Sequence, residues 1–478
     1  MIYRVMGLLV LIETLMLLCC IGVSIFYGED DLHSFIITTL ITSLVGGIFL
    51  FSGRKAVREF SKRDGIIIVS ISWVIVSLLG MLPFYISGYI PDITNAFFET
   101  ISGFTSTGTT ILDDIEALPH GLLFWRSMTQ WIGGLGIVFF TLAVLPIFGI
   151  GNVQLFAAEA SGFASDKVHP RIGVTAKWIW SIYLGLTIIT AILLWVGGMN
   201  IFDSVCHAFA TASTGGYSTK QASIEFYHSP FIEYVISIFM TISGINFTLL
   251  LLFINRRFRK FFQDTELKWY LASIVTFTLL IGFGLYKSSP MGVEEAFRKA
   301  LFQVTSLHTS TGFATADYMT WKPVLWGLLT VIMLIGACAG STSGGIKCIR
   351  MVILSKIASN EFKRIIHPNA VLPVRINQKV APPTIITSVL AFIFVYLVIV
   401  IISCLTMMAL GVDFESSVGT VISSIGNMGP GLGITGPANS WNNLPNACKW
   451  LSSFLMLVGR LELFTILILF SGGFWKKS

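Results

Sequence analysis

Four short copies of one glycine-centred pattern most restrict what this chain can fold into. Three copies read Ser-Thr-Gly and one reads Asn-Met-Gly: Ser106-Thr107-Gly108, Ser213-Thr214-Gly215, Ser310-Thr311-Gly312 and Asn427-Met428-Gly429. Each copy follows a short amphipathic segment and precedes a long apolar one. Four such loops predict backbone segments that converge on one axis, where carbonyl oxygens can replace the water shell of a cation. The pattern therefore indicates selective cation permeation rather than catalysis.

The composition indicates an integral membrane protein. Of the 478 residues, 54% are hydrophobic and only 12% are charged, whereas a soluble domain carries about 25% charged residues. A membrane-spanning helix needs about 20 mostly apolar residues. Ten segments are long and apolar enough: 3–27, 34–52, 65–87, 121–147, 174–198, 230–254, 269–287, 323–347, 383–411 and 446–471. An even number of spans places both termini on the same side of the membrane.

The basic residues lie in alternate loops between these spans. Their groups fall within 54–63, 167–177, 256–268, 347–379 and 476–477. The positive-inside rule assigns these loops and both termini to the cytoplasm. The net charge of +6 therefore reflects membrane topology, and no nucleic-acid partner is expected. The opposite loops are acidic, and they either raise the local cation concentration or are simply solvated.

The chain divides into an N-terminal hairpin and four repeats. Residues 1–64 form a transmembrane hairpin without a glycine loop. Each repeat is expected to hold a spanning helix, a short re-entrant segment, a glycine loop and a second spanning helix. The repeats cover 65–150, 151–256, 257–350 and 351–478. The predicted fold class is an all-α integral membrane protein with four helix–pore-loop–helix repeats around one pore.

The re-entrant segments are too short to cross a bilayer. They cover 92–105, 201–212, 294–309 and 413–426. Each begins with polar or acidic residues that suit a helix N-terminus. The opposite end of a helix carries about half a negative charge, so four such ends aimed at one cavity would stabilise a partly dehydrated cation. Irregular backbone at membrane depth is tolerated only where it is buried or lines water, which again predicts a pore.

The loop residues supply candidate oxygen ligands. Glycine at the loop centre allows backbone dihedrals that are closed to other residues, so that successive carbonyls can point toward the axis. Thr107, Thr214 and Thr311 add hydroxyl oxygens. The alternative interpretation is four helix-breaking turns in a transporter that has no filter.

At these loops the chain resembles the Trk/Ktr/HKT superfamily of potassium transporters, and within it the TrkH-like membrane subunits. The matching stretches are 103–110, 211–219, 308–315 and 425–433, with support from 131–138 and 336–347. The resemblance covers nearly the whole chain, including the N-terminal hairpin. It implies potassium uptake across the bacterial inner membrane through a pseudo-fourfold pore, in a homodimer. It also implies control by a separate cytosolic nucleotide-binding subunit, a TrkA-like ring.

The fourth loop departs from the Ser-Thr-Gly pattern at Asn427 and Met428, which indicates an asymmetric filter. In HKT relatives a serine at the position of Gly108 goes with sodium preference, so glycine in all four loops favours potassium. Potassium is thus the expected cargo, and no covalently bound cofactor is expected.

A glycine-rich stretch interrupts the second apolar segment of the third repeat. Glycine costs about 1 kcal/mol per residue in a helix relative to alanine, so this stretch is expected to unwind. The resemblance implies a gate beneath the filter, formed by Gly336, Gly340, Ser341, Thr342, Ser343, Gly344, Gly345 and Lys347. The alternative is a small-residue surface for helix packing.

Arg460 lies deep in the last apolar segment. A charge at that depth costs roughly 2.5–3.5 kcal/mol on insertion scales, so it is expected to face water or a partner. The resemblance places it at the pore beside the gate, where it would repel cations. The alternative is a structural ion pair elsewhere in the bundle.

Two rival functions remain open at this point. One is a sodium-permeable or cation-coupled symporter of the same fold. The other is a polytopic membrane enzyme that acts on lipid pyrophosphate through Asp113 and Asp114. The histidines show no metal-ligand spacing and no Ser/His/Asp constellation can be defended, so we predict that the chain is not an enzyme.

Overall fold

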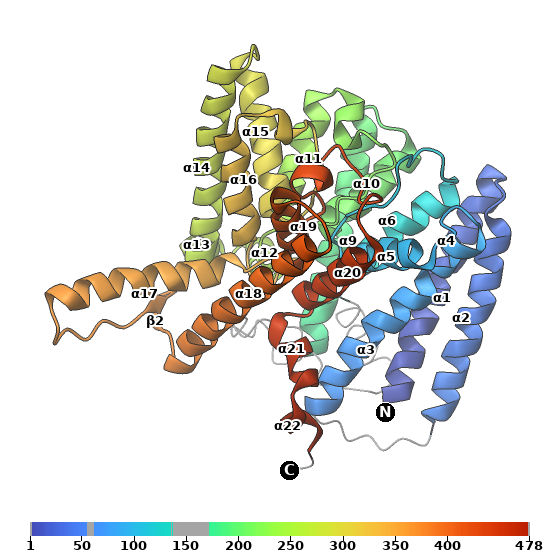
Figure 1. Cartoon of the computed structure of the whole chain (residues 1–478), viewed down its shortest axis with the longest axis horizontal. Coiled ribbons are helices and arrows are strands. Elements are labelled where there is room, and N and C mark those ends of the chain that lie inside the picture. Colours follow the sequence, from blue (N-terminus) through green and yellow to red (C-terminus); the bar gives the residue numbers. More distant parts are fainter. Residues whose placement is uncertain (1, 55–61, 135, 137–171, 477–478) are drawn as a thin grey trace.

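The computed structural model describes residues 2–54, 62–134, 136 and 172–476 (Figure 1). Several sequence predictions fall outside these residues. They are the part of the span at 121–147 beyond Gly134 (Gly136 excepted), the domain boundary at 150, and the basic residues Lys55, Arg58, Lys167, Arg171 and Lys477.

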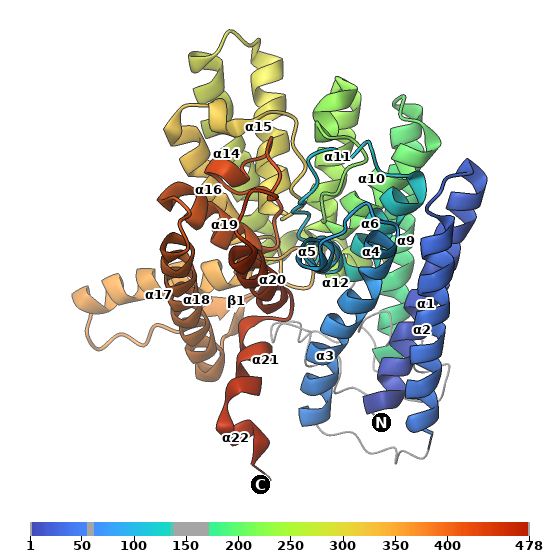
Figure 2. The same cartoon turned by 45° about the vertical axis from the view of Figure 1, so that its right-hand side comes forward.

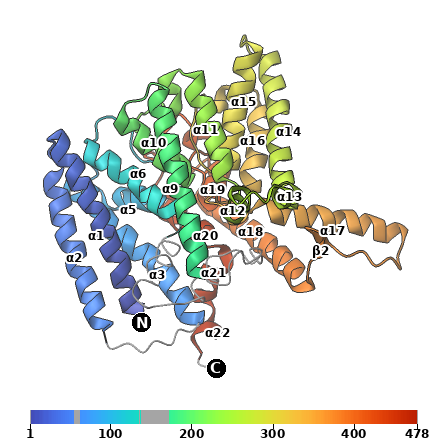
Figure 3. The same ribbon diagram turned by 180° about the vertical axis from the view of Figure 1, so that it is seen from behind.

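The described part of the chain is a helical bundle with one small hairpin of strands. The strands β1 (Arg375–Ile376) and β2 (Lys379–Val380) pair antiparallel. Both labelled termini lie at the same end of the bundle in Figures 1, 2 and 3. α17 (Cys348–Ile366) projects away from the other helices, as Figures 1 and 3 show.

The N-terminal helices α1 (Ile2–Tyr27) and α2 (Leu32–Ser52) pack side by side at one edge of the bundle (Figure 2). Small residues allow their close approach. A Cβ atom built on Gly7 would lie 2.9 Å from the carbonyl oxygen of Gly46. Contacts of this kind replace the hydrophobic driving force that is missing between helices in lipid.

After this pair, one order of elements recurs four times: a long helix, a short helix, an irregular loop and another helix. The long and short helices are α3 (Lys62–Gly80) with α4 (Leu82–Ile86) and α5 (Ile93–Phe104), α9 (Ile172–Val196) with α10 (Ile201–Ser213), α14 (Thr265–Ser288) with α15 (Val293–His308), and α18 (Pro383–Ala409) with α19 (Phe414–Gly426). The helices after the loops are α6 (His120–Gly134), α11 (Pro230–Ser243) with α12 (Phe247–Ile254), α16 (Pro323–Ile335), and α20 (Asn446–Arg460) with α21 (Leu463–Leu467). Smaller elements among the described residues are α13 (Phe258–Gln263), α22 (Gly472–Trp475) and the 3-10 turns at Ser223–Tyr227, Tyr318–Thr320, Gly433–Thr435 and Ile468–Phe470.

Among the described residues, six helices are long and apolar enough to cross a membrane, and eight if two sharply bent pairs are counted as spans. Two predicted continuous spans are wrong, and a third segment is interrupted where its glycine-rich stretch was expected to unwind. The segment 230–254 bends by 102° between α11 and α12, and 446–471 bends by 115° between α20 and α21. The segment 323–347 is helical only as far as Ile335.

Each break has a local cause. Asn246 caps α12 by accepting a hydrogen bond from the amide of Thr248 at 2.8 Å, which is a typical helix start. Gly336 has φ 68° and Glu462 has φ 60°, both outside the helical region. The interrupted helices bring irregular backbone into the centre of the bundle.

The four short helices form the buried centre. α5, α10 and α19 are buried over most of their length, and α15 over its C-terminal half. Asp92 and Asp413 cap α5 and α19 by accepting the amides of Asn95 and Ser416, each at 3.0 Å. α10 is capped by Asn200 rather than Asp203. These helices carry the glycine loops at their C-terminal ends.

Candidate functional site

Each short helix ends in the same backbone conformation. Ser106, Thr214, Ser310 and Asn427 have φ between 52° and 55°, in the left-handed region. The next amide then donates to a carbonyl five residues earlier. These bonds run from Thr107 to Ser102, Gly215 to Ala210, Thr311 to Ser306 and Met428 to Ser423, at 2.8–3.0 Å. This is the Schellman arrangement, which satisfies carbonyls in the last helical turn.

In all four loops, the residue directly after the donor of the Schellman bond is a glycine with positive φ. These glycines are Gly108 (85°), Gly216 (79°), Gly312 (82°) and Gly429 (93°). In the second loop the structure therefore places Gly216, and not Gly215, at the position of Gly108. Thr214 takes the position of Ser106, and Ser213 is the last residue of α10. Matching the letters Ser-Thr-Gly missed this one-residue shift because Gly215 and Gly216 are adjacent.

The four loops contact one another in a closed ring. A Cβ atom built on Gly108 would lie 2.0 Å from the carbonyl oxygen of Gly215 in the second loop. The same construction puts Gly216 at 1.9 Å from Thr311 O, Gly312 at 2.2 Å from Met428 O, and Gly429 at 3.0 Å from Thr107 O. Each glycine thus packs against a carbonyl of the next loop, and the last loop returns to the first. The predicted filter residues are brought together at one place.

The loops differ in how they are held. In the first and third loops, Thr107 Oγ1 bonds Thr105 Oγ1 and Thr311 Oγ1 bonds Thr309 Oγ1, each at 2.7 Å. In the fourth loop, Asn427 Nδ2 donates to Thr107 Oγ1 at 3.0 Å and to Met456 O at 2.9 Å. In the second loop, Gln130 of α6 donates to Gly215 O at 2.6 Å.

A second set of polar side chains supports the loops from behind. In each short helix, one such side chain lies three residues before the residue whose carbonyl accepts the Schellman bond. The four are Glu99, His207, Gln303 and Thr420. Each bonds the chain beyond its own loop, at Ile111 N (3.0 Å), Ser218 Oγ (2.9 Å), Ala316 O (3.2 Å) and Thr435 Oγ1 (3.1 Å). These four residues share no sequence motif and were not predicted, although counting back from each loop aligns them.

Glu99 also forms a buried ion pair with Arg126 of α6. The Nε–Oε1 distance is 2.9 Å, and both side chains are almost fully buried. The guanidinium lies 4.1 Å from the ring centroid of Tyr217 and donates to Ser218 O at 3.2 Å. Removing one partner of a buried pair costs about 3–5 kcal/mol because the other charge is left uncompensated. The pair therefore ties the first loop to the second.

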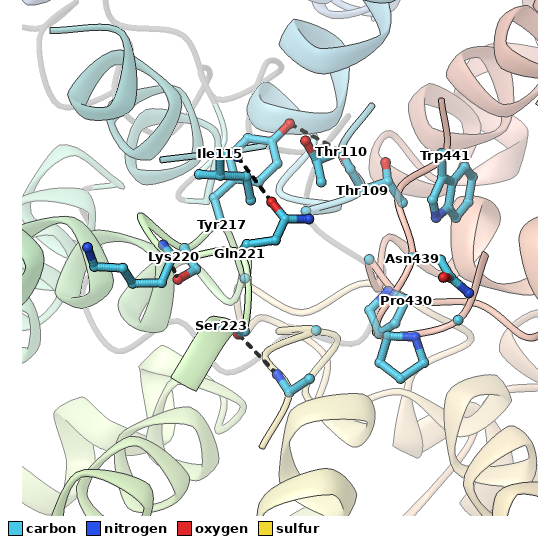
Figure 4. A pocket seen from close by; sticks show the side chains of 18 of the residues that line it. Thr109, Thr110, Ile115, Tyr217, Lys220, Gln221, Ser223, Pro430, Asn439 and Trp441 are labelled. Atoms are coloured by element: carbon cyan, nitrogen blue, oxygen red, sulfur yellow. Dashed lines mark hydrogen bonds between the residues drawn. The ribbon is translucent and has the colours of Figure 1, made fainter. Parts of the chain in front are cut away.

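A cavity opens on one side of the ring, and all four positive-φ glycines line it. Figure 4 shows Tyr217, Lys220 and Gln221 on one wall, and Pro430, Asn439 and Trp441 on another. Nearly all of its lining residues follow the loops in sequence.

The acidic loop beside this cavity is bonded to the protein itself. Asp113 accepts hydrogen bonds from Ser440 Oγ and, at 2.7 Å, from Asn442 Nδ2. Within the described residues, no group of three or more His, Cys, Asp or Glu side chains is placed to hold a metal ion. Through its bonds to Ser440 and Asn442, Asp113 joins the loop after α5 to the segment before α20.

The predicted gate segment at 336–347 lies on the side of the ring where the short helices end, opposite the cavity. Thr342 Oγ1 is 3.1 Å from Thr214 Oγ1, and the amide of Gly344 donates to Ser310 Oγ at 2.8 Å. A Cβ atom on Gly344 would lie 2.2 Å from Gly426 O. The segment thus contacts the ends of α10, α15 and α19.

Two basic side chains, Arg460 from α20 and Lys347 at the end of the segment itself, donate to backbone carbonyls of this segment. Arg460 Nη1 donates to Thr342 O at 2.8 Å, and Nη2 donates to Gly134 O at 2.6 Å and to Gly133 O. Lys347 Nζ donates to Ser343 O. The nearby Glu462 pairs with Arg350 at 2.5 Å. Arg460 therefore links the gate segment to the end of α6.

Glu266 is a gate contact that the sequence analysis missed. It lies in the first turn of α14, and its Oε1 accepts the amides of Ala339 at 2.7 Å and Ile349 at 3.0 Å. One carboxylate oxygen thus spans the gate segment from near its start to just past its end. No local pattern reveals this contact, because its partners lie more than 70 residues away.

The chain is similar over nearly its whole length to known transport proteins. Residues 32–477 match the model of the TrkH family, described as cation transport protein. The chain is 39% identical to the Trk system potassium uptake protein TrkH of Escherichia coli K12, over 99% of each chain. It is 36% identical to TrkH of Halomonas elongata, over 100% of this chain and 99% of the relative. The crystal structure of the potassium transporter TrkH from Vibrio parahaemolyticus matches with a TM-score of 0.89 and 35% identity, over 99% of both chains.

Proposed function

The chain belongs to the TrkH family of cation transport proteins, and we propose that it takes up potassium across the bacterial inner membrane. The family is one of transporters, so the prediction that the chain is not an enzyme is confirmed and the lipid-pyrophosphate alternative is wrong. The observation that carries the proposal is the closed ring of loops, in which four carbonyls lie against four positive-φ glycines.

The ring is the proposed selectivity filter. The carbonyl oxygens of Thr107, Gly215, Thr311 and Met428 replace the hydration shell of a potassium ion, as carbonyl rings do in cation filters. The C-terminal ends of α5, α10, α15 and α19 add partial negative charge at the same place. Glycine leaves room for a large cation, which favours potassium over the sodium alternative.

The filter implies four pseudo-fourfold repeats after an N-terminal hairpin at 1–64. We place the repeats at 65–150, 151–256, 257–350 and 351–478, so that each contributes one loop. Flux needs no coupled chemical step, because an inside-negative membrane potential supplies about 2.3 kcal/mol per elementary charge and 100 mV. Both termini then lie in the cytoplasm, following the positive-inside rule.

The segment 336–347 and Arg460 form the proposed gate. The segment lies across the ends of three pore helices, and the Arg460 guanidinium adds positive charge beneath the ring. In this position the segment blocks the path and the charge repels cations. Opening requires that Thr342 and Gly344 leave Thr214 and Ser310.

We further propose that the protein works as a homodimer with a cytosolic nucleotide-binding regulatory ring. The contacts of the β1–β2 hairpin favour the segment 347–382 as the surface on which this ring docks. Asn377, in the hairpin turn, donates to Asp264 Oδ2 and accepts the amide of Thr265, both at 2.7 Å. Glu266, the next residue of α14, bonds the gate segment. A partner that moves the hairpin therefore also moves the start of α14, and through Glu266 it moves the gate segment.

Rubidium uptake into proteoliposomes of the purified protein tests the proposal. We expect uptake that follows an imposed potential and is inhibited by potassium far more strongly than by sodium. Gly312→Ala should abolish it, because the new methyl group meets Met428 O. Uptake that requires a sodium or proton gradient would instead establish the coupled symporter.

A further inference from the structure

The second filter loop lacks the side chain that fixes the first and third. Its ring carbonyl belongs to Gly215, where those loops have Thr107 and Thr311 with their paired hydroxyls. Gly215 is not among the residues with positive φ, so its backbone conformation is open to residues with side chains. Another reason must explain the glycine at this position.

Gln130 supplies that reason. Its side chain is fully buried and enters from α6. A Cβ atom built on Gly215 would meet Gln130 Cδ at 2.5 Å, Oε1 at 2.6 Å and Nε2 at 2.9 Å, and these are its three nearest atoms. Gly215 therefore leaves the space that the Gln130 amide fills.

The Gln130 amide clips the loop at two points. Nε2 donates to Gly215 O at 2.6 Å, and Oε1 accepts the amide of Tyr217 at 3.0 Å. Among the described residues, Gly215 is the only one of the four ring residues whose carbonyl accepts a hydrogen bond from a side chain. That bond fixes the position of the carbonyl and occupies one of its two lone pairs.

We propose that Gln130 is a specificity-determining positioning residue, which sets the place and field of the Gly215 carbonyl and thereby the preference of the ring for potassium over sodium. This inference rests on the filter proposed above. Selectivity depends on the size of the carbonyl ring and on the field strength of its dipoles. A carbonyl released from Gln130 can move inward and present both lone pairs, which favours the smaller sodium ion.

The primary test compares Gln130→Met with Thr190→Val. Methionine keeps the length of the side chain and removes both hydrogen bonds. Thr190 is the control, because it is also fully buried and its hydroxyl donates at 2.7 Å to Leu186 O within α9, away from the ring. The readout is the sodium concentration that halves rubidium uptake, together with the rubidium concentration at half-maximal uptake.

We expect Gln130→Met to lower the inhibiting sodium concentration about fivefold, the scale of one net hydrogen bond, and Thr190→Val to leave it unchanged. A merely structural role for Gln130 would change the maximal rate or thermal stability and leave the sodium-to-rubidium ratio alone. The same ratio in both variants overturns the inference.

A second pair of variants does not depend on the first. Gly215→Ala should abolish uptake while Gln130 is present, and Gln130→Ala in the same chain should restore part of it, a strong non-additivity expected for touching residues. Full activity of Gly215→Ala alone overturns the inference. If Gly312→Ala still transports, the filter proposal fails instead, so the two failures are distinguishable.

Discussion

The filter loops and the gate segment are both glycine-rich and irregular, yet they are held in different ways. Each filter glycine follows a Schellman turn of its own helix and packs against a carbonyl of the next loop. Besides backbone bonds to Gly244 and Phe247, the gate segment is held by side chains from elsewhere, chiefly Arg460, Glu266 and Ser310. Backbone contacts cannot be exchanged without breaking the helix ends, whereas side-chain hydrogen bonds can be exchanged for water. The filter should therefore be rigid and the gate movable.

The largest expected effect breaks the rigid part. Gly312→Ala places a methyl group 2.2 Å from Met428 O at a residue with φ 82°. The left-handed conformation alone costs roughly 1–2 kcal/mol for a side-chain residue, which is about tenfold in a rate, and the clash adds to it. We expect rubidium uptake to fall more than tenfold.

Gly47→Ala is the control, because a Cβ atom there meets nothing within 4 Å. It should transport like the native protein. Native uptake by Gly312→Ala would mean that the loops do not line the path.

The second prediction frees the movable part. Arg460→Ala removes the donors to Thr342, Gly133 and Gly134 together with a positive charge beneath the ring. Uptake by proteoliposomes should rise severalfold, because the gate is released and the barrier to cations is lowered. Arg460→Lys, which keeps the charge, should raise it less. Unchanged or lower uptake by well-folded Arg460→Ala protein would contradict the gate.

A smaller effect sharpens the same point. Glu266→Ala removes the acceptor for the amides of Ala339 and Ile349, so uptake should rise, but less than in Arg460→Ala because no pore charge is lost. Glu266→Gln keeps an acceptor oxygen and should stay near the native rate. Equal uptake by the alanine and glutamine variants would show that this contact does not restrain the gate.

The smallest effect concerns a single hydroxyl of the filter. Thr311→Val removes the bond to Thr309 Oγ1 and leaves the backbone ring in place. One net hydrogen bond is worth about 0.5–1.5 kcal/mol, so the rubidium concentration at half-maximal uptake should change a few-fold. Thr330→Val, which breaks a bond to Trp326 O within α16, is the control and should not shift it. Equal shifts would mean that Thr311 acts only through stability.

Local patterns predicted the parts of the fold that depend on local physics. The apolar runs place α1, α2, α14 and α18, and the glycine loops mark the ends of the short helices. The breaks after Ser243 and Arg460 were missed because apolar composition continues across them. At the first break, Gly244 O accepts the amide of Cys338, a partner more than 90 residues away.

The candidate site was only partly predictable for a similar reason. Helix caps and glycine dihedrals are local, so the loops could be found, apart from the shift at Gly215 and Gly216. The roles of Gln130, Glu99 and Glu266 depend on partners from 12 to 87 residues away. Such pairings are decided by packing and leave no periodic signal.

The central claim is that four main-chain oxygens from one polypeptide hold a bare potassium ion. Anomalous diffraction from crystals grown in rubidium tests it most directly, because rubidium replaces potassium and is located by its own scattering. The account predicts a rubidium peak within coordination distance of Thr107 O, Gly215 O, Thr311 O and Met428 O. A well-resolved map with rubidium bound elsewhere in the protein and none at these oxygens would contradict it.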